Sequence, residues 1–214
     1  SAIGTGTIIM ENVVIMSGCY IGDNTTILPN TVIFANTHIG SNCRIGANCT
    51  IGSYPMVYSS EMDKGYTAMN YIGSVYIENN VDIGSQVNID SAIVGYTLIK
   101  DGTKIGAQTH IAHDCIVGKN NYIVTQVGMA GWSQTGDNCY LSGQVGVNGR
   151  VKIGSNVTVH AKSGVHNDLP DSTTYFRTPA RTKKESFRIF AALKYLPELI
   201  KRVALLEKKI NNGY

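Results

Sequence analysis

Residues 1–54 read SAIGTG TIIMEN VVIMSG CYIGDN TTILPN TVIFAN THIGSN CRIGAN CTIGSY, and isoleucine occupies the third position of all nine hexads. The same period returns in residues 77–89 and then continues in a shifted phase from Ile93 to Val165. A period of six fits neither the α-helix nor a plain two-residue strand alternation. It fits short strands joined by tight turns, with three strands in a coil of about 18 residues and coils stacked at about the 4.8 Å strand spacing.

This repeat predicts a mainly β protein, a left-handed parallel β-helix of hexapeptide repeats over residues 1–168, followed by a C-terminal α-helical tail. In the shifted phase the isoleucine column stays apolar except at Thr135. The position two residues before the column shares the interior and is small, with Asn121 as an exception. Glycine often follows the isoleucine, where we expect the turn to need its relaxed backbone limits: Gly22, Gly40, Gly46, Gly52, Gly84, Gly106 and Gly154.

The cysteines all fall on the small interior position. They are Cys19, Cys43, Cys49, Cys115 and Cys139. A buried free cysteine behaves as a small apolar side chain, so packing explains all five without a disulfide or a zinc site.

Composition limits the class of protein. Charged residues make up only 15% of the chain, which excludes a disordered or coiled-coil composition. No apolar run approaches the roughly 18 residues that a membrane span needs, and no signal-peptide pattern opens the chain. We therefore expect a soluble, cytoplasmic protein.

Two irregularities interrupt the repeat. Residues from about 52 to 76 form an inserted loop that holds five of the twelve tyrosines, including Tyr54 and Tyr58. A loop rich in aromatic side chains that leaves a rigid scaffold indicates either a binding wall for substrate or a cap on a neighbouring subunit. A shorter irregularity from Asp90 to Thr97 shifts the phase, and we expect a bulge or short loop there.

The tail over residues 169–214 predicts an extended linker and C-terminal helices. From Arg181 to Lys209 there are nine Lys or Arg and three Asp or Glu, although the whole chain carries only +3. Pro197 predicts the first turn of one helix, preceded by a separate helix over Lys183 to Leu193. Apolar residues then recur in 3-4-3-4 spacing, a seam typical of packing on trimer mates: Leu196, Leu199, Val203, Leu206 and Ile210. The basic face is either a solvated surface or a dock for an acidic partner.

The candidate chemistry lies in Thr109 to Gly118, read THIAHDCIVG. His110, His113 and Asp114 supply a base and an orienting partner within five residues. Gly131 follows His113 by 18 residues, which is one coil, so we expect it to stack over the imidazole. A glycine N–H there can bind the oxyanion of a thioester carbonyl while His113 removes a proton from the attacking nucleophile. The alternative is that Gly131 is an ordinary turn glycine without a catalytic role.

Several segments resemble the UDP-3-O-(3-hydroxyacyl)glucosamine N-acyltransferase family of lipid A biosynthesis: Ile111–Asp114, Asn88–Asp90, Thr97–Gly102, Gly128–Gly131, Thr178–Ala180 and Leu196–Leu199. The resemblance covers nearly the whole chain. It implies a homotrimer that moves a 3-hydroxyacyl chain from acyl carrier protein to the amine of a UDP-glucosamine derivative, with His113 as base and Gly131 as oxyanion donor. The donor acyl chain is carried on the phosphopantetheine of acyl carrier protein, so the resemblance implies no resident cofactor. Because the carrier protein is acidic, we expect it to bind the basic C-terminal helices.

The sequence also departs from the family pattern. A uridine-binding domain precedes the coil in that family, and we expect this chain, which enters the repeat at Ile3, to lack it. A second family histidine falls on Arg150, which cannot act as a base but can hold a phosphate. Trp132 follows Gly131 and walls or shortens the acyl groove, beside Met129. The family's Asp-Gly-Phe-Gly-Tyr stretch corresponds to residues 54–58 of this chain, which have a different sequence. We expect Tyr54 and Tyr58 to contact the acceptor there.

Other functions stay open. An acetyl-CoA-dependent sugar N-acetyltransferase on the same fold is favoured by Trp132 and by the expected lack of the uridine-binding domain. A zinc hydratase on a trimeric β-helix would need metal ligands, but the spacing of the histidines matches no ligand pattern, and we predict no metal. A non-catalytic scaffold leaves the His113 segment unexplained, and no nucleic-acid motif accompanies the basic tail.

Overall fold

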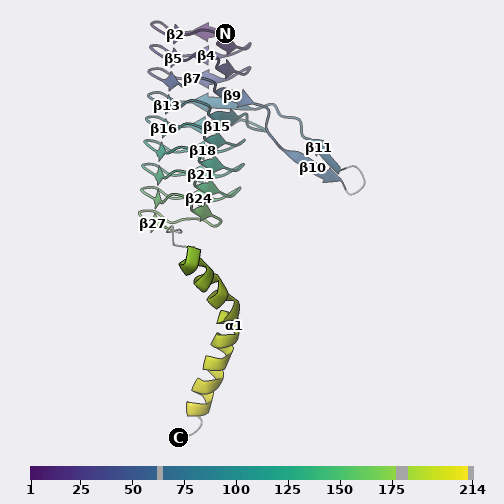
Figure 1. The fold of residues 1–214 in the computed structure, drawn as a ribbon. Coiled ribbons are helices and arrows are strands. Elements are labelled where there is room, and N and C mark those ends of the chain that lie inside the picture. The colour runs from purple at the N-terminus through teal and green to yellow at the C-terminus, as the bar shows by residue number, and fades with distance from the viewer. Residues whose placement is uncertain (62–64, 177–182, 212–214) are drawn as a thin grey trace. The chain divides into compact units, whose positions relative to one another are not determined.

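The computed structural model describes residues 1–61, 65–176 and 183–211. Figure 1 shows short strands stacked coil on coil over the first part of the chain. Partners in neighbouring coils are 18 residues apart in the regular parts, as in Ala2 opposite Tyr20 and His110 opposite Gly128. The predicted left-handed parallel β-helix is confirmed.

The strands form three parallel sheets, named A, B and C here. Sheet A contains β1 (Ala2–Ile3), β4 (Tyr20–Ile21), β7 (His38–Ile39), β12 (Ser74–Ile77), β15 (Tyr96–Ile99), β18 (Ile116–Val117), β21 (Gln134–Thr135) and β24 (Lys152–Ile153). Sheet B contains β2 (Ile8–Ile9), β5 (Thr26–Ile27), β8 (Arg44–Ile45), β13 (Asp82–Ile83), β16 (Lys104–Ile105), β19 (Tyr122–Ile123), β22 (Tyr140–Leu141), β25 (Thr158–Val159) and β27 (Thr174–Tyr175). Sheet C contains β3 (Val14–Ile15), β6 (Val32–Ile33), β9 (Thr50–Ser53), β14 (Asn88–Asp90), β17 (His110–Ile111), β20 (Gly128–Met129), β23 (Gly146–Val147) and β26 (Gly164–Val165).

The isoleucine column forms the core of the coil. Ile21, Ile39 and Ile77 stack in sheet A, and each is fully buried. Burying one such side chain contributes about 1.5–3 kcal/mol to folding, so the column is the main source of stability. The coil also continues past the predicted boundary at residue 168, because β27 pairs with β25 in its last turn.

The two polar exceptions in the interior pattern are partners of each other. Asn121 Nδ2 donates a hydrogen bond to Thr135 Oγ1 at 2.7 Å and another to the Gly136 carbonyl at 3.0 Å. Asn121 Oδ1 accepts the backbone N–H of Cys139 at 2.6 Å. The buried amide is therefore satisfied on both sides, which is the condition for placing a polar group in a core.

Most of the glycines after the isoleucines serve a different purpose from the one predicted. Only Gly52 has a positive φ, at 85°, so the expectation of a relaxed backbone is wrong for the other six. Those glycines avoid a steric clash with the next coil. A Cβ on Gly22 would lie 2.5 Å from the carbonyl carbon of Gly40. The left-handed residue of most turns comes three after the isoleucine and is usually asparagine, as at Asn24 and Asn42.

The inserted loop leaves sheet C at the end of β9, after Ser53, and returns to sheet A at β12. It contains an antiparallel hairpin of β10 (Tyr58–Glu61) and β11 (Gly65–Ala68). The positive φ of Gly52 lies where the chain leaves the coil. The expected bulge is present as well, since the register between β14 and β9 shifts between Ile89 and Asp90.

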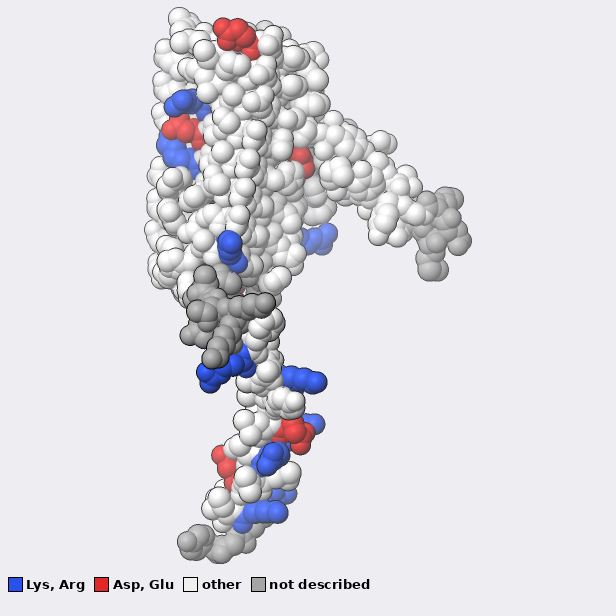
Figure 2. Space-filling model, in the orientation of Figure 1, with Lys and Arg blue, Asp and Glu red and all other residues white. Residues whose placement is uncertain are grey.

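The tail contains one helix where two were predicted. Helix α1 (Lys183–Asn211) runs through Pro197 without a break, so the prediction of a separate helix ending at Leu193 is wrong. Proline removes one backbone hydrogen bond and disfavours a helix interior, but here it does not end the helix. The seam residues Leu196 to Ile210 are 45–65% exposed, and Lys and Arg gather along the helix (Figure 2). In the described chain no helix is long and apolar enough to cross a membrane.

The Asn121–Thr135 pair gives a test of the interior. Asn121→Val or Thr135→Val alone should lower the free energy of unfolding by about 1–3 kcal/mol, because each leaves a buried polar partner unsatisfied. The double substitution should cost less than the sum of the two. Denaturant unfolding followed by circular dichroism measures all three variants. Thr26→Val, on the outer face of β5, is the control and should change stability by less than about 0.5 kcal/mol; strictly additive costs would contradict the pairing.

Candidate active site

His113 and Asp114 form a carboxylate–imidazole dyad in the turn after β17. His113 is 7% exposed, and its Nδ1 lies 2.9 Å from Asp114 Oδ2. The same carboxylate oxygen accepts the Ile93 N–H at 3.0 Å, and the Asp114 N–H donates to Thr97 Oγ1 at 2.9 Å. An ionised carboxylate only accepts hydrogen bonds, so Nδ1 of neutral His113 carries the proton and Nε2 presents a lone pair. The irregular segment from Asp90 to Thr97 thus supplies the contacts that hold the dyad.

Gly131 lies against the imidazole of His113 in the next coil, as the 18-residue register predicts. A Cβ at this position would overlap Nε2 and Cε1 of His113, so only glycine fits without moving the ring. The Trp132 N–H donates to the His113 carbonyl at 3.1 Å, which fixes the two turns against each other. The Gly131 N–H has no hydrogen-bond partner within the described residues. It is available to a bound group beside Nε2.

Trp132 and Arg150 form a wall on one side of His113. The Trp132 ring meets the imidazole edge-on with centroids 4.4 Å apart, and Arg150 Cζ lies 5.0 Å from the centroid of the Trp132 ring. With Asn148 and Gly149 they line a hollow of about 320 Å³. Asparagine is the usual left-handed residue of these turns, but here Trp132 and Arg150 adopt φ of 61° and 66°. Gln126, Gln144 and Lys162 occupy the same turn position with φ of 60°, so the coil accepts long side chains there.

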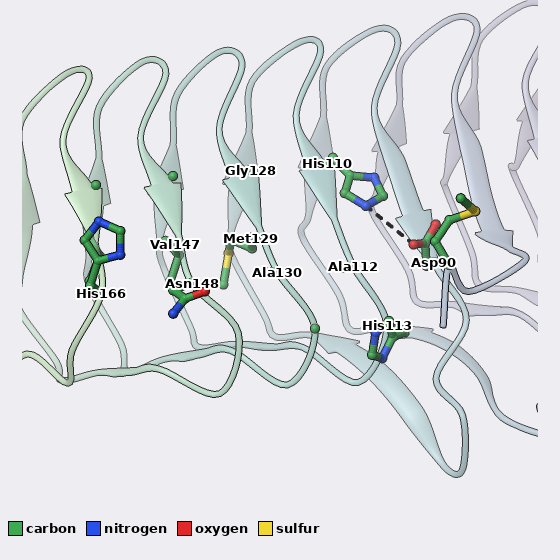
Figure 3. A pocket seen from close by; sticks show the side chains of 15 residues that line it. Asp90, His110, Ala112, His113, Gly128, Met129, Ala130, Val147, Asn148 and His166 are labelled. Atoms are coloured by element: carbon green, nitrogen blue, oxygen red, sulfur yellow. Dashed lines mark ion pairs between the residues drawn. The ribbon is translucent and has the colours of Figure 1, made fainter. Parts of the chain in front are cut away.

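A longer groove of about 620 Å³ runs over sheet C from the same histidine (Figure 3). Its floor follows the outward column of the sheet, in which His110 pairs with Gly128, Gly128 with Gly146, and Gly146 with Gly164. A Cβ on Gly128 or Gly146 would meet nothing within 4 Å, so the missing side chains are what hollow the surface. The rest of the lining is mostly apolar: Met56, Ala112, Met129, Ala130, Val147 and Val165. An extended apolar chain fits this shape and chemistry.

Asp90 and His110 lie at one end of the groove, as Figure 3 shows. Asp90 Oδ2 is 3.4 Å from His110 Nε2, and Asp90 Oδ1 accepts the Ser53 hydroxyl at 2.8 Å. Burial raises the pKa of the Asp90 carboxyl, while the Ser53 hydrogen bond and the two nearby histidines oppose that rise. His110 therefore partners Asp90 and not the dyad.

The structure brings most of the predicted site residues together and adds others. His110, His113, Met129 and Gly131 line the groove, with Trp132 and Arg150 in the adjoining hollow. Tyr54 and Tyr58 line neither. Tyr54 stacks edge-on with Tyr71, and the Tyr58 hydroxyl lies 3.7 Å from Met56 Sδ. The residues that sequence reasoning missed include Asp90, Asn148 and His166 in the coil, the floor glycines Gly146 and Gly164, and Met56 in the loop. Only Asp90 carried a signal, as the first residue of the phase shift.

The cysteines take no part in this chemistry. All five are free and buried, as the packing interpretation predicts. Burial raises the pKa of each thiol, and that of Cys115 reaches about 11, so none is a thiolate near neutral pH. In residues 1–61, 65–176 and 183–211 no cluster of three or more His, Cys, Asp or Glu is placed to hold a metal ion.

The contact between Gly131 and His113 can be tested directly. Gly131→Ala should displace the imidazole, because the added methyl occupies the space of Nε2 and Cε1. The imidazole NMR signals of His113 should shift, while Gly146→Ala should leave them in place because its methyl meets open space. Unchanged His113 signals in Gly131→Ala would contradict the geometry.

Comparison with known proteins agrees with this architecture. The bacterial transferase hexapeptide family (six repeats) matches residues 1–35, 25–54 and 96–131. The UDP-N-acetylglucosamine acyltransferase of Campylobacter jejuni has a similar fold, with a TM-score of 0.73 and 24% identity over 91% of this chain and 79% of its own. The enzyme of the same name from Francisella novicida has a TM-score of 0.71 and 25% identity, over 87% of this chain and 70% of its own.

Similar sequences carry a more specific name. UDP-3-O-acylglucosamine N-acyltransferase of Thermosynechococcus vestitus is 51% identical over 139 residues, which are 65% of this chain and 41% of the relative. The protein of that name from Syntrophotalea carbinolica is 48% identical over 69% of this chain and 43% of its own length. The chain thus spans less than half of these relatives. It is a hexapeptide-repeat protein homologous, over about two-thirds of its length, to UDP-3-O-acylglucosamine N-acyltransferases.

Proposed function

We propose that the chain is an N-acyltransferase that moves a 3-hydroxyacyl group from acyl carrier protein to the amine of a UDP-3-O-acylglucosamine in lipid A biosynthesis. The observation that carries the proposal is the His113–Asp114 dyad, whose Nε2 lies against Gly131 at the side of an apolar groove. The name of the relatives gives the same acceptor and the same transfer to nitrogen.

The residues account for each proton and electron pair of the transfer. The acceptor nitrogen attacks the thioester carbonyl while His113 Nε2 takes a proton from the amine. The carbonyl electrons move to oxygen, which the Gly131 N–H stabilises, and Asp114 stabilises the imidazolium through Nδ1. Collapse of the intermediate re-forms the carbonyl and breaks the carbon–sulfur bond. The sulfur takes the proton from His113, leaving an amide and a free thiol.

The two hollows beside His113 suit the two substrates. The groove over Gly128, Gly146 and Gly164 is apolar and longer than an acetyl group needs, which favours a long acyl donor over acetyl-CoA. The hollow at Trp132 and Arg150 carries a fixed cation, which suits the diphosphate of a nucleotide sugar.

The proposal includes a homotrimer and a carrier-protein dock. Helix α1 exposes its apolar seam from Leu196 to Ile210, and such a face is normally covered by another helix. Its Lys and Arg residues complement the acidic surface expected of the carrier protein.

His113→Ala is the decisive variant. Transfer from acyl carrier protein should fall about 10²–10⁴-fold, since the general base is lost. Asp114→Asn should also slow transfer, because an amide no longer selects the productive imidazole tautomer. Product formation is measured by mass spectrometry, with acetyl-CoA as a competing donor. His160→Ala, outside both hollows, is the control and should keep full activity. Full activity in His113→Ala, or faster turnover with acetyl-CoA, would sink the proposal.

The far end of the groove should limit the donor chain. His166 lines both the groove and a further hollow of about 310 Å³ near Tyr175 and Phe176. His166→Ala should join the two spaces, so that the preferred donor becomes longer. Transfer rates for a series of acyl lengths measure the shift. An unchanged length preference would show that His166 does not end the chain site.

A further inference from the structure

A third hollow, of about 440 Å³, lies on the outer face of sheet B beside β13 and β16 (Figure 1). It shares no lining residue with the groove over sheet C or with the hollow beside His113, so the proposed transfer does not use it. One wall is the turn that follows the strands, lined by Gly46, Gly84, Ser85 and Gly106. The other wall is the outward column of the sheet, in which successive coils carry Arg44, Asp82, Lys104 and Tyr122. We call this space the sheet B hollow.

The sheet B hollow carries one uncompensated positive charge. Lys104 Nζ lies 2.9 Å from Asp82 Oδ2 and donates a hydrogen bond to the Asn80 carbonyl at 2.8 Å, so this ion pair is held in place. Arg44 is opposite Asp82 on the other side, but within the described residues its side chain has no ion pair or hydrogen bond. With two cations and one carboxylate in the lining, the excess charge is that of Arg44, which is always protonated.

Polar groups suited to an uncharged part of a ligand lie next to this cation. Asp82 Oδ1 and the hydroxyls of Ser85 and Tyr122 form no hydrogen bond within the described part of the chain. The Tyr122 ring is 50% exposed and meets Tyr140 edge-on, with centroids 5.4 Å apart. A carboxylate accepts and a hydroxyl donates or accepts, while the ring offers a flat apolar surface. Together they match a sugar, which has hydroxyls around its rim and an apolar face.

The spacing of the column joins the two parts of such a ligand. Arg44 and Asp82 are in neighbouring coils, about 4.8 Å apart along the sheet, so an anion on Arg44 and a hydroxyl on Asp82 can belong to one small molecule. Tyr122 is two coils beyond Asp82 and lines the same hollow. The hollow is larger than a lone phosphate needs, which favours a ligand with a body attached to its anionic group.

We propose that the sheet B hollow is a binding site for a phosphorylated sugar. Arg44 holds the phosphate through charge-assisted hydrogen bonds, which guanidinium and phosphate commonly form in pairs. Asp82 accepts a sugar hydroxyl, the sugar's apolar face lies against Tyr122, and Lys104 is a positioning residue that holds the Asp82 carboxylate. The site stands apart from the proposed acyl transfer and does not depend on it.

Titration of the full chain with glucose 6-phosphate, followed by NMR, tests the site. The amide signals of Ser85 and Gly106 should shift to saturation, because both residues line the hollow. Arg44→Gln should weaken this binding about tenfold or more, since the phosphate loses its charged partner. Lys119→Gln removes the same charge from an exposed turn outside the hollow and is the matched control. Arg150→Gln, in the hollow beside His113, should likewise leave the Ser85 shifts unchanged.

Glucose and inorganic phosphate are the companion probes. Each should bind at least about tenfold more weakly than glucose 6-phosphate, because each meets only half of the site. Asp82→Ala should narrow the preference for glucose 6-phosphate over inorganic phosphate, since the sugar loses its acceptor while the phosphate gains the freed Lys104. Circular dichroism shows whether each variant is folded.

Three results would overturn the inference. They are the absence of shifts at Ser85 and Gly106, equal weakening by Lys119→Gln and Arg44→Gln, and equal affinity for inorganic phosphate and glucose 6-phosphate. Acyl transfer is not among the readouts, so the proposed function and the sheet B site stand or fall separately.

Discussion

The whole structure depends on one constraint, the stacking of coils in register so that each backbone strand bonds to the strand one coil away. The spacing of about 4.8 Å is too small for a second layer of side chains, so equivalent positions in successive coils touch each other. The interior column becomes a stack of isoleucines, and the turns exclude a Cβ where two coils meet, as at Gly22. The same closeness presses Gly131 against His113. Scaffold and site therefore arise from one geometric rule.

Function enters where this rule is broken. The regular coil supplies His113 and Gly131, but the contacts that orient the dyad come from Ile93 and Thr97, in the segment that shifts the phase. The larger excursion contributes Ser53, which holds Asp90, and Met56, which lines the groove. A perfect repeat would place a base over a glycine without anchoring Asp114, the carboxylate that fixes the tautomer of the base. The irregular segments add the polar contacts that a repeating unit cannot provide at only one level of the stack.

Sequence reasoning predicted the features that depend on period and missed those that depend on contact across irregular segments. The six-residue period was sufficient for the fold, the cysteine positions and the Gly131 register. It could not show that His110 pairs with Asp90, because residues 20 apart come together only through the bulge at Ile89 and Asp90. The single helix α1 escaped prediction because a proline is read locally as a helix start, whereas the residues on both sides of Pro197 favour one continuous helix.

The groove shows how a solenoid can build a binding site at low structural cost. Outward positions on sheet C contribute little to the core, so replacing them by Gly128, Gly146 and Gly164 deepens the surface without disturbing the inward column of Met129, Val147 and Val165. Each additional glycine lengthens the hollow by one coil, about 4.8 Å, and the first large side chain ends it. The number of consecutive coils that lack an outward side chain therefore sets the length of extended ligand that the groove can hold.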